Sequence, residues 1–439
     1  MNALRHRRNQ RAGEIAINVV TMLLCRRATT RLAPRFSGQL RRLSASSTPG
    51  QYTTSDVAER VAQRVAERKE WPTWKEPTLA GILKFGSMPD PPLPSAAELD
   101  VEFPVKPPDF ERLANPPVGE IQLTWFGHAT VLCQFNGVNI IADPVFSDRC
   151  SPFQWSGPRR FRQPPCSLND LKQHGIPIDV CLISHNHYDH LDYNSVRDLA
   201  RDFDPHFVVP LGLRRWFESR LLALYPAGGG FMHGRGHKIS EVDWWDEVAT
   251  IPMPVQPAPA AERDADNNGG EESQPQPKLD EPQYMPLKFT AVPMQHWSNR
   301  LGWDIDKTLW CGYVVESTTT TTTTTSDSNS SSSVRPQRFL FTGDTGWFDG
   351  LKLMPERFPG GFEWAAIPIG AYTPRDFLRP QHMNPEEGVR MYQAVGAEKA
   401  MPIHWGTFML TKEDVLEPRK QLIVRHVVVC VCVCVLRES

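Results

Sequence analysis

The sequence has 439 residues, of which 40% are hydrophobic, so the chain can bury a large core and form one large domain with additional segments. Its 48 lysines and arginines nearly balance 50 aspartates and glutamates, and this net charge of −2 argues against a main role in nucleic-acid binding. Nine scattered cysteines include no CxxC pair, which excludes the disulfide framework of small secreted domains and favours reduced thiols inside a cell.

The first fifty residues differ from the rest, because they contain ten arginines and a single acidic residue, Glu14. A basic, acid-poor segment is typical of a mitochondrial presequence, so we predict a mitochondrial protein that is peripheral on a membrane. The apolar stretch at residues 15–24 is shorter than the roughly 20 apolar residues needed to span a bilayer. The alternative interpretation is a basic arm that binds a membrane or nucleic acid. Residues 51–84 are expected to be a linker.

A dense group of potential metal ligands occupies residues 185–190, which read His-Asn-His-Tyr-Asp-His. An apolar run predicts a buried strand before the group, and the residues after it predict the start of a helix. The group therefore lies in a loop that leaves a strand, where α/β proteins usually place their chemistry. On extended backbone His185 and His187 point to the same side and can reach one ion. Asp189 and His190 follow at the turn, where they suit a second ion.

Three later residues, His296, Asp344 and His404, each follow an apolar run that predicts a strand. A site with two metal ions needs a third ligand for each ion and a carboxylate between them. The glycine that precedes Asp344 allows a close approach of the backbone. A single histidine is more often a polar core residue than a ligand, but the joint order of these three residues favours metal binding.

Together these motifs resemble the metallo-β-lactamase superfamily. The resemblance implies an αββα sandwich, in which two mixed sheets lie face to face with helices outside, and two Zn²⁺ per chain in a cleft at one edge. The implied ligands are His185, His187 and His296 for one ion, Asp189, His190 and His404 for the other, and Asp344 as the bridge between them.

Further segments are similar to the family of N-acylphosphatidylethanolamine-hydrolysing phospholipases D, and they extend the resemblance over residues 85–418. These segments are residues 123–130, 142–147, 157–162, 184–195, 209–213, 365–375 and 381–387, with the sequences around His296, Asp344 and His404. The resemblance implies hydrolysis of N-acylphosphatidylethanolamine to N-acylethanolamine and phosphatidic acid, by a hydroxide shared between the two ions. The H-x-K-x-x-x-x-D motif of the other phospholipase D chemistry does not occur in the sequence.

The resemblance places Asp189, Asp344 and His382 at the reaction, with His382 near the substrate phosphate. For His382 the alternative is a side chain that caps the following helix. Asp143 could steer a ligand histidine by accepting its free ring N–H, or could simply start a turn. Likewise, His128 could contact the substrate or metal-bound water, or cap its own turn. The cluster Arg159, Arg160 and Arg162 could meet lipid phosphates, or each arginine could be a solvated surface charge.

Two low-complexity segments, residues 253–284 and 317–333, interrupt the domain and are predicted to be disordered, because neither buries enough apolar surface to offset its ordering entropy. Outer helices are expected at residues 197–203 and 385–395. Residues 419–439 form an atypical tail, in which a valine–cysteine repeat is β-prone and a liability for aggregation.

Two other functions stay open at this point. A protein of the same fold could hydrolyse another ester, such as a sugar-phosphate lactone, because a fold does not fix the substrate. From a different class, the chain could be a catalytically dead protein that binds metal or associates with a membrane. The predicted partner is a phospholipid at a membrane surface. Nucleic acid is not predicted, and a homodimer is an option that the sequence leaves open.

Overall fold

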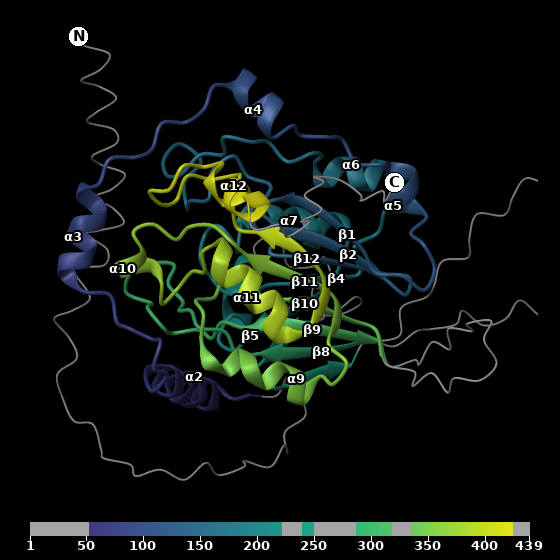
Figure 1. Ribbon diagram of the computed structural model, residues 1–439. Helices are drawn as coiled ribbons and strands as arrows, with labels where there is room; N and C mark the ends of the chain where they lie inside the picture. The colour runs from purple at the N-terminus through teal and green to yellow at the C-terminus, as the bar shows by residue number, and fades with distance from the viewer. Residues whose placement is uncertain (1–51, 222–238, 250–286, 318–335, 425–439) are drawn as a thin grey trace, which may run out of the picture.

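The computed structural model describes residues 52–221, 239–249, 287–317 and 336–424, and its helices and strands are labelled in Figure 1. The predicted disordered segments 253–284 and 317–333 lie outside the described residues, apart from Ser317 at the end of a strand. The presequence at residues 1–50 and the valine–cysteine repeat also lie outside them.

Two mixed six-stranded sheets form the centre of the molecule. The first contains, in spatial order, β1 (Gln122–Gly127), β2 (Thr130–Phe135), β3 (Val138–Ala142), β4 (Val180–Leu182), β5 (His206–Pro210) and β6 (Ile239–Val242). The second contains β12 (Ala397–Ile403), β11 (Phe362–Pro368), β10 (Arg338–Phe341), β9 (Gly312–Ser317), β8 (Leu287–Val292) and β7 (Glu247–Ala249). In each sheet antiparallel pairs at one side give way to parallel pairs, β3 to β6 and β10 to β12.

The inner faces of the two sheets share one core. Val131 and Ile140 of the first sheet belong to the same buried cluster as Phe289 and Val315 of the second. Successive side chains of a strand point to opposite faces, so neighbours such as Leu132 pack on the outer face of the first sheet instead. Apolar burial on both faces explains why these strands are almost continuously hydrophobic.

Helices cover both outer faces. Besides α2 (Thr54–Lys69), the described residues form helices α3 (Leu79–Ser87), α4 (Ala96–Glu102), α5 (Phe110–Ala114), α6 (Leu168–Gln173), α7 (Tyr193–Asp202), α8 (Arg214–Leu221), α9 (Met354–Arg357), α10 (Arg375–Leu378), α11 (Pro385–Val395) and α12 (Glu417–Val424), with a 3₁₀ helix at Asp349–Leu353. Residues of α6, α7 and α8 pack on the first sheet, whereas α11 lies against β11 and β12 (Figure 1). The αββα sandwich and both predicted outer helices are therefore confirmed.

Local sequence explains where the two predicted helices begin and end. Asp192 caps α7 by accepting hydrogen bonds from the backbone of the first turn, and Asn384 caps α11 in the same way. Pro385 occupies the first turn of α11, and Gly396 ends that helix in a left-handed conformation with φ 69°.

Residues 51–84 are not a linker, contrary to our expectation. They contain helix α2 (Thr54–Lys69), which begins with a capping box formed by Thr53 and Asp56, and most of α3. Val61 and Arg68 of α2 are buried against the sandwich. The domain boundary expected at residue 418 is also wrong, because α12 crosses it and buries Leu422 in the common core.

Within the described ranges, none of the helices combines the length and the apolar character needed to cross a bilayer.

A candidate metal centre at one edge of the sandwich

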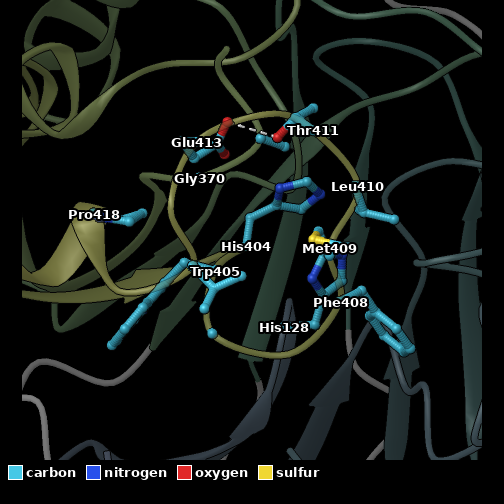
Figure 2. A pocket seen from close by; sticks show the side chains of 13 residues that line it. His128, Gly370, His404, Trp405, Phe408, Met409, Leu410, Thr411, Glu413 and Pro418 are labelled. Carbon is cyan, nitrogen blue, oxygen red and sulfur yellow. Dashed lines mark hydrogen bonds between the residues drawn. The ribbon is translucent and has the colours of Figure 1, made fainter. Parts of the chain in front are cut away.

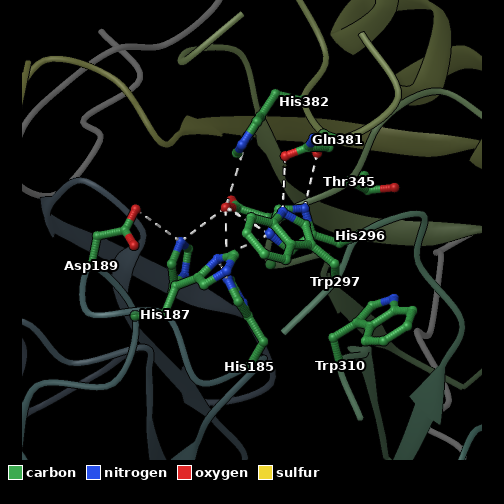
Figure 3. Close-up of polar contacts among 12 residues, drawn as sticks. His185, His187, Asp189, His296, Trp297, Trp310, Thr345, Gln381 and His382 are labelled. Atoms are coloured by element: carbon green, nitrogen blue, oxygen red, sulfur yellow. Dashed lines mark hydrogen bonds and ion pairs between the residues drawn. The ribbon is translucent and has the colours of Figure 1, made fainter. Parts of the chain in front are cut away.

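The predicted ligands meet at one edge of the sandwich, where strands of both sheets end. The segment 185–190 follows β4, and His296, Asp344 and His404 follow β8, β10 and β12. Figure 3 shows His185, His187, His296 and His382 pointing toward one another from different segments. All seven predicted metal ligands, together with His382, are thus brought together.

The first group contains His185, His187 and His296, whose ring nitrogens lie within 4.8 Å of one another. The Nδ1 atom of His187 is 2.9 Å from His185 Nε2 and 3.3 Å from His296 Nε2. The outward ring nitrogens have their own partners: His185 Nδ1 contacts Ser184 Oγ at 2.9 Å, and His296 Nδ1 contacts the Gln381 carbonyl at 3.1 Å. These contacts leave three imidazole nitrogens directed at one point.

The second group contains Asp189, His190 and His404, and the structure adds His128 to it. The Oδ2 atom of Asp189 lies 3.0 Å from His128 Nε2, 3.2 Å from His404 Nε2 and 3.5 Å from His190 Nε2. Neither sequence-based interpretation of His128 included this contact with Asp189. His128 lies in the turn between β1 and β2 with φ 51°. This left-handed conformation is uncommon for residues other than glycine, and the sequence does not predict it.

Asp344 lies between the two groups. Its Oδ2 atom is 3.1 Å from Nε2 of both His190 and His404, and 3.7 and 3.8 Å from Nε2 of His296 and His185. Gly343, with φ 58°, brings the carboxylate there, and a Cβ atom at this glycine would lie 2.4 Å from the Ser184 side chain.

Asp143 contacts the outward ring nitrogen of His190 in the second group, which agrees with the interpretation that it steers a ligand histidine. Its side chain has no solvent exposure and its Oδ2 atom lies 2.7 Å from His190 Nδ1. It also accepts hydrogen bonds from the backbone N–H and the hydroxyl of Ser184. A carboxylate on the outward nitrogen fixes the ring orientation of a ligand histidine and makes its other nitrogen more basic.

The charges of the cluster fall into two classes. Burial holds the pKa values of His185 and His296 well below the usual range and lowers that of His187 to about 4, so these rings are neutral at pH 7. Burial also opposes charge on His404, but Asp344 and Asp189 outweigh it and raise the pKa of His404 to about 9. The same balance of burial against carboxylates raises the pKa of His190.

The donor set fits divalent cations. Neutral imidazoles and ionised carboxylates are the ligands that zinc takes at catalytic sites. Among the described residues, Asp344 Oδ1 is buried without a hydrogen-bond partner, which is costly unless something else satisfies it. In the metal-free protein, protons on His190 and His404 supply the positive charge beside Asp344 and Asp189, and cations at the cluster would replace them.

His382 lies at the side of the cluster, with Nδ1 3.8 Å from Asp344 Oδ2 and without a hydrogen-bond partner among the described residues. Its ring lies 5.2 Å from that of His404, measured between centroids. It therefore does not use its side chain to cap the following helix, whose cap is Asn384. Burial lowers the pKa of His382 to about 3.

The arginine cluster does not form one lipid-binding face. Arg160 is buried and donates to the carbonyls of Ser147 and Val145, so it holds a loop. Arg159 pairs with Asp148 on the surface, and Arg162 pairs with Asp100.

A small cavity of about 20 Å³ opens beside the second group, enough for about one water molecule. Figure 2 shows His128 and His404 at this cavity, with Trp405, Phe408, Met409 and Leu410 around them.

The sequence matches the family model described as β-lactamase superfamily domain over residues 138–405, more than half of the chain. It is 33% identical over 303 residues to N-acyl-phosphatidylethanolamine-hydrolyzing phospholipase D 1 of Caenorhabditis elegans, and the match covers 68% of each protein. It is 28% identical over 301 residues to a mitochondrial N-acyl-phosphatidylethanolamine-hydrolyzing phospholipase D of Saccharomyces cerevisiae, which covers 68% of this chain but only 50% of the longer yeast protein.

Among solved structures, a metallo hydrolase from Ignicoccus hospitalis is similar, with 16% identity and a TM-score of 0.43 over 72% of this chain and 95% of that one.

Proposed function

Because this chain belongs to the metallo-β-lactamase superfamily and, within it, to the family of N-acylphosphatidylethanolamine-hydrolysing phospholipases D, we propose that it is a zinc-dependent enzyme that hydrolyses N-acylphosphatidylethanolamine to N-acylethanolamine and phosphatidic acid. The family and the histidine–aspartate cluster make it a metal-dependent hydrolase. The phospholipid substrate, the identity of the metal as zinc and the number of two ions are the parts that we propose.

One observation carries the proposal: Asp344 lies between two groups of three or more converging donors. A carboxylate in this position would serve as a ligand of both proposed cations. Two bound cations would make an attacking water more acidic and offset the charge of a phosphodiester. His185, His187 and His296 would hold one ion, and the group around Asp189 the other.

His382, which is not among the proposed ligands of either ion, suits the substrate phosphate. His382 Nδ1 lies 3.8 Å from Asp344 Oδ2 and has no hydrogen-bond partner within the described ranges, so its imidazole is available for a phosphate oxygen beside the cluster. Since burial lowers its pKa to about 3, it would act there as a neutral hydrogen-bond donor. His128 would instead orient Asp189, which it contacts at 3.0 Å.

Exposed aromatic side chains support a substrate at a membrane surface. Phe153 and Trp155 stack on each other at 5.2 Å and are 53% and 76% exposed. The loop that carries them also lines a cavity of about 350 Å³, and Leu301, two residues before the exposed Trp303, lines the same cavity. Aromatic rings of this kind favour the boundary between lipid and water.

The mitochondrial location is also a proposal. It rests on the basic composition of residues 1–50 and on the word mitochondrial in the name of the yeast relative. A fusion of residues 1–50 to a fluorescent protein should accumulate in mitochondria, and a diffuse signal would contradict this location.

The reaction can be tested by mass spectrometry of the products. The purified chain, loaded with zinc, would receive N-acylphosphatidylethanolamine in mixed micelles, with a soluble phosphodiester and a sugar-phosphate lactone in parallel. We expect phosphatidic acid and N-acylethanolamine, and loss of both products with a chelator. Turnover of the lactone alone would identify a different hydrolase of the same fold. A folded, zinc-loaded protein without any product would support a catalytically dead metal-binding protein.

A further inference from the structure

Helix α2 reaches the metal centre through one side chain, Arg68. This arginine is fully buried, and its Nη1 atom donates a hydrogen bond of 3.0 Å to the backbone carbonyl of His296. The helix precedes residues 138–405, which the family model matches, so Arg68 lies outside the part of the chain that defines the superfamily. In Figure 1, α2 lies at the lower edge of the molecule, at the purple end of the colour scale.

The surroundings of Arg68 hold its guanidinium group in one orientation. Its Nη1 and Nη2 atoms donate to the two carboxylate oxygens of Asp306, at 3.1 and 2.9 Å. The rings of Trp74 and Trp310 flank the guanidinium carbon at 3.9 and 4.8 Å. Burial of an arginine is costly unless its charge is paired, and the fork of two bonds to Asp306 provides that pairing. The bond to His296 is therefore made by a pre-oriented donor.

His296 is consequently held at both ends. Its ring nitrogen Nδ1 contacts the Gln381 carbonyl at 3.1 Å, and its own carbonyl accepts from Arg68. The remaining ring nitrogen, Nε2, faces His187 and Asp344. Neighbouring contacts reinforce this segment, since the hydroxyl of Thr73 donates to the side chain of Gln295 at 2.5 Å.

We infer that Arg68 is a positioning residue, which holds the His296 backbone so that its imidazole stays in place as a ligand of one of the two proposed ions. The inference rests on the proposed metal site. Among the donors of the cluster that the structure describes, His296 is the one to which Arg68 hydrogen-bonds, so we expect only the ion held by His185, His187 and His296 to depend on it. Partners behind a ligand typically change metal affinity by about 10–100-fold when they are removed.

Arg64 offers a matched control on the same helix. It lies one turn before Arg68 and also binds a carboxylate, with Nε and Nη2 at 2.8 and 3.2 Å from the oxygens of Asp243. Removal of Arg64 loosens the attachment of α2 without removing a contact to His296. Arg68→Met keeps the length of the side chain but loses its donors, and Arg68→Lys keeps the charge but not the fork.

The test measures the release of zinc to a chromophoric chelator, the visible spectrum of the Co²⁺-loaded protein, and kcat and KM at saturating zinc. For Arg68→Met we expect one of the two ions to leave at least about tenfold faster, a changed Co²⁺ spectrum, and a lower kcat with a nearly unchanged KM. Arg68→Lys should lie between this variant and the wild type. Arg64→Met should lower the melting temperature but release zinc like the wild type.

Several results would overturn the inference. Wild-type zinc release and spectrum in Arg68→Met would show that the contact is only structural. Equal acceleration in Arg64→Met would show that any loosening of α2 has the same effect. If Arg68→Met does not fold, Arg68→Lys decides between these outcomes, because a wild-type release rate from it would also count against the inference. A wild-type protein that binds no zinc would overturn the proposed function and this inference together. If the wild type is active and zinc-loaded, the variant results above decide this inference alone and leave the proposed function intact.

Discussion

The Oδ2 atom of Asp143 lies 2.7 Å from Nδ1 of His190, and this contact turns the other nitrogen of the ring toward Asp344. Neither Asp143 nor His190 has solvent exposure, so no water competes for the contact. Asp143, directly after β3, thereby orients the ring of His190, which follows β4.

We therefore expect Asp143→Asn to weaken metal binding by about 10–100-fold and to lower turnover, because an amide cannot accept equally from His190 and Ser184. Competition with a chelator would measure the affinity. Asp179→Asn is the control, since Asp179 is also a mostly buried aspartate but accepts from the Asn139 backbone away from the cluster. Equal zinc affinity in the two variants would refute this role of Asp143.

Asp344→Asn should lose activity by more than about 100-fold, because a neutral amide bridges two cations poorly and the bridge contributes several kcal/mol of charge stabilisation. The variant should still fold, since the amide has nearly the same size. Steady-state kinetics and zinc analysis would be measured together. Unchanged turnover would exclude a site in which two ions share Asp344.

Metal binding should release protons near neutral pH. Burial disfavours a charged His404, but Asp344 and Asp189 raise its pKa in the metal-free protein from 6.5 to about 9. Protonated His404 therefore stabilises the metal-free fold fully below pH 6.5, and this contribution is lost as the pH rises to 9. A cation must displace the proton of His404, and this displacement alone should increase zinc affinity by up to about tenfold per pH unit across this window.

Titrations against a chelator between pH 6.5 and 9, beside melting curves of the metal-free protein, would check both statements. We expect the melting temperature of the metal-free protein to fall over the range in which zinc affinity rises. A zinc affinity that does not depend on pH would contradict a protonated His404.

The aromatic pair should anchor the protein to lipid. Phe153→Ser and Trp155→Ser each remove one exposed apolar side chain. Each variant is expected to bind phospholipid vesicles about tenfold more weakly, because less apolar surface is buried in the lipid. Vesicle co-sedimentation would measure this. Val118→Ser, at a residue that is 96% exposed, is the control for loss of any apolar surface group. Vesicle binding at the wild-type level in the Phe153 and Trp155 variants would place the lipid contact elsewhere.

The sequence predicted the ligand cluster because its signals are local. Two histidines on extended backbone after an apolar strand share one side, and His296, Asp344 and His404 each end a strand of their own. The order of the strands in the sheets is implied by the family resemblance alone. The structure confirms that the ligand-bearing strands of both sheets end at one edge of the sandwich.

Other features depend on tertiary contacts that leave little trace in the sequence. Helix α2 is an exception, because Val57, Val61 and Val65 recur every four residues in the sequence and pack against the core. This periodicity and the capping box at Thr53 and Asp56 both indicate a helix, and the expectation of a linker overlooks them. No comparable signal exists for His128, whose contact with Asp189 depends on a turn with positive φ and on the packing of distant loops.

The wide separation of the donors along the chain has a consequence for how the protein matures. A nascent chain that has emerged from the ribosome only as far as β11 contains residues 185–190, His296 and Asp344 but still lacks His404. Both carboxylates of the cluster would then face the second group with one imidazole fewer to balance them. The group around Asp189 can thus complete its set of donors only after β12 and His404 have been synthesised, later than the group of His185, His187 and His296.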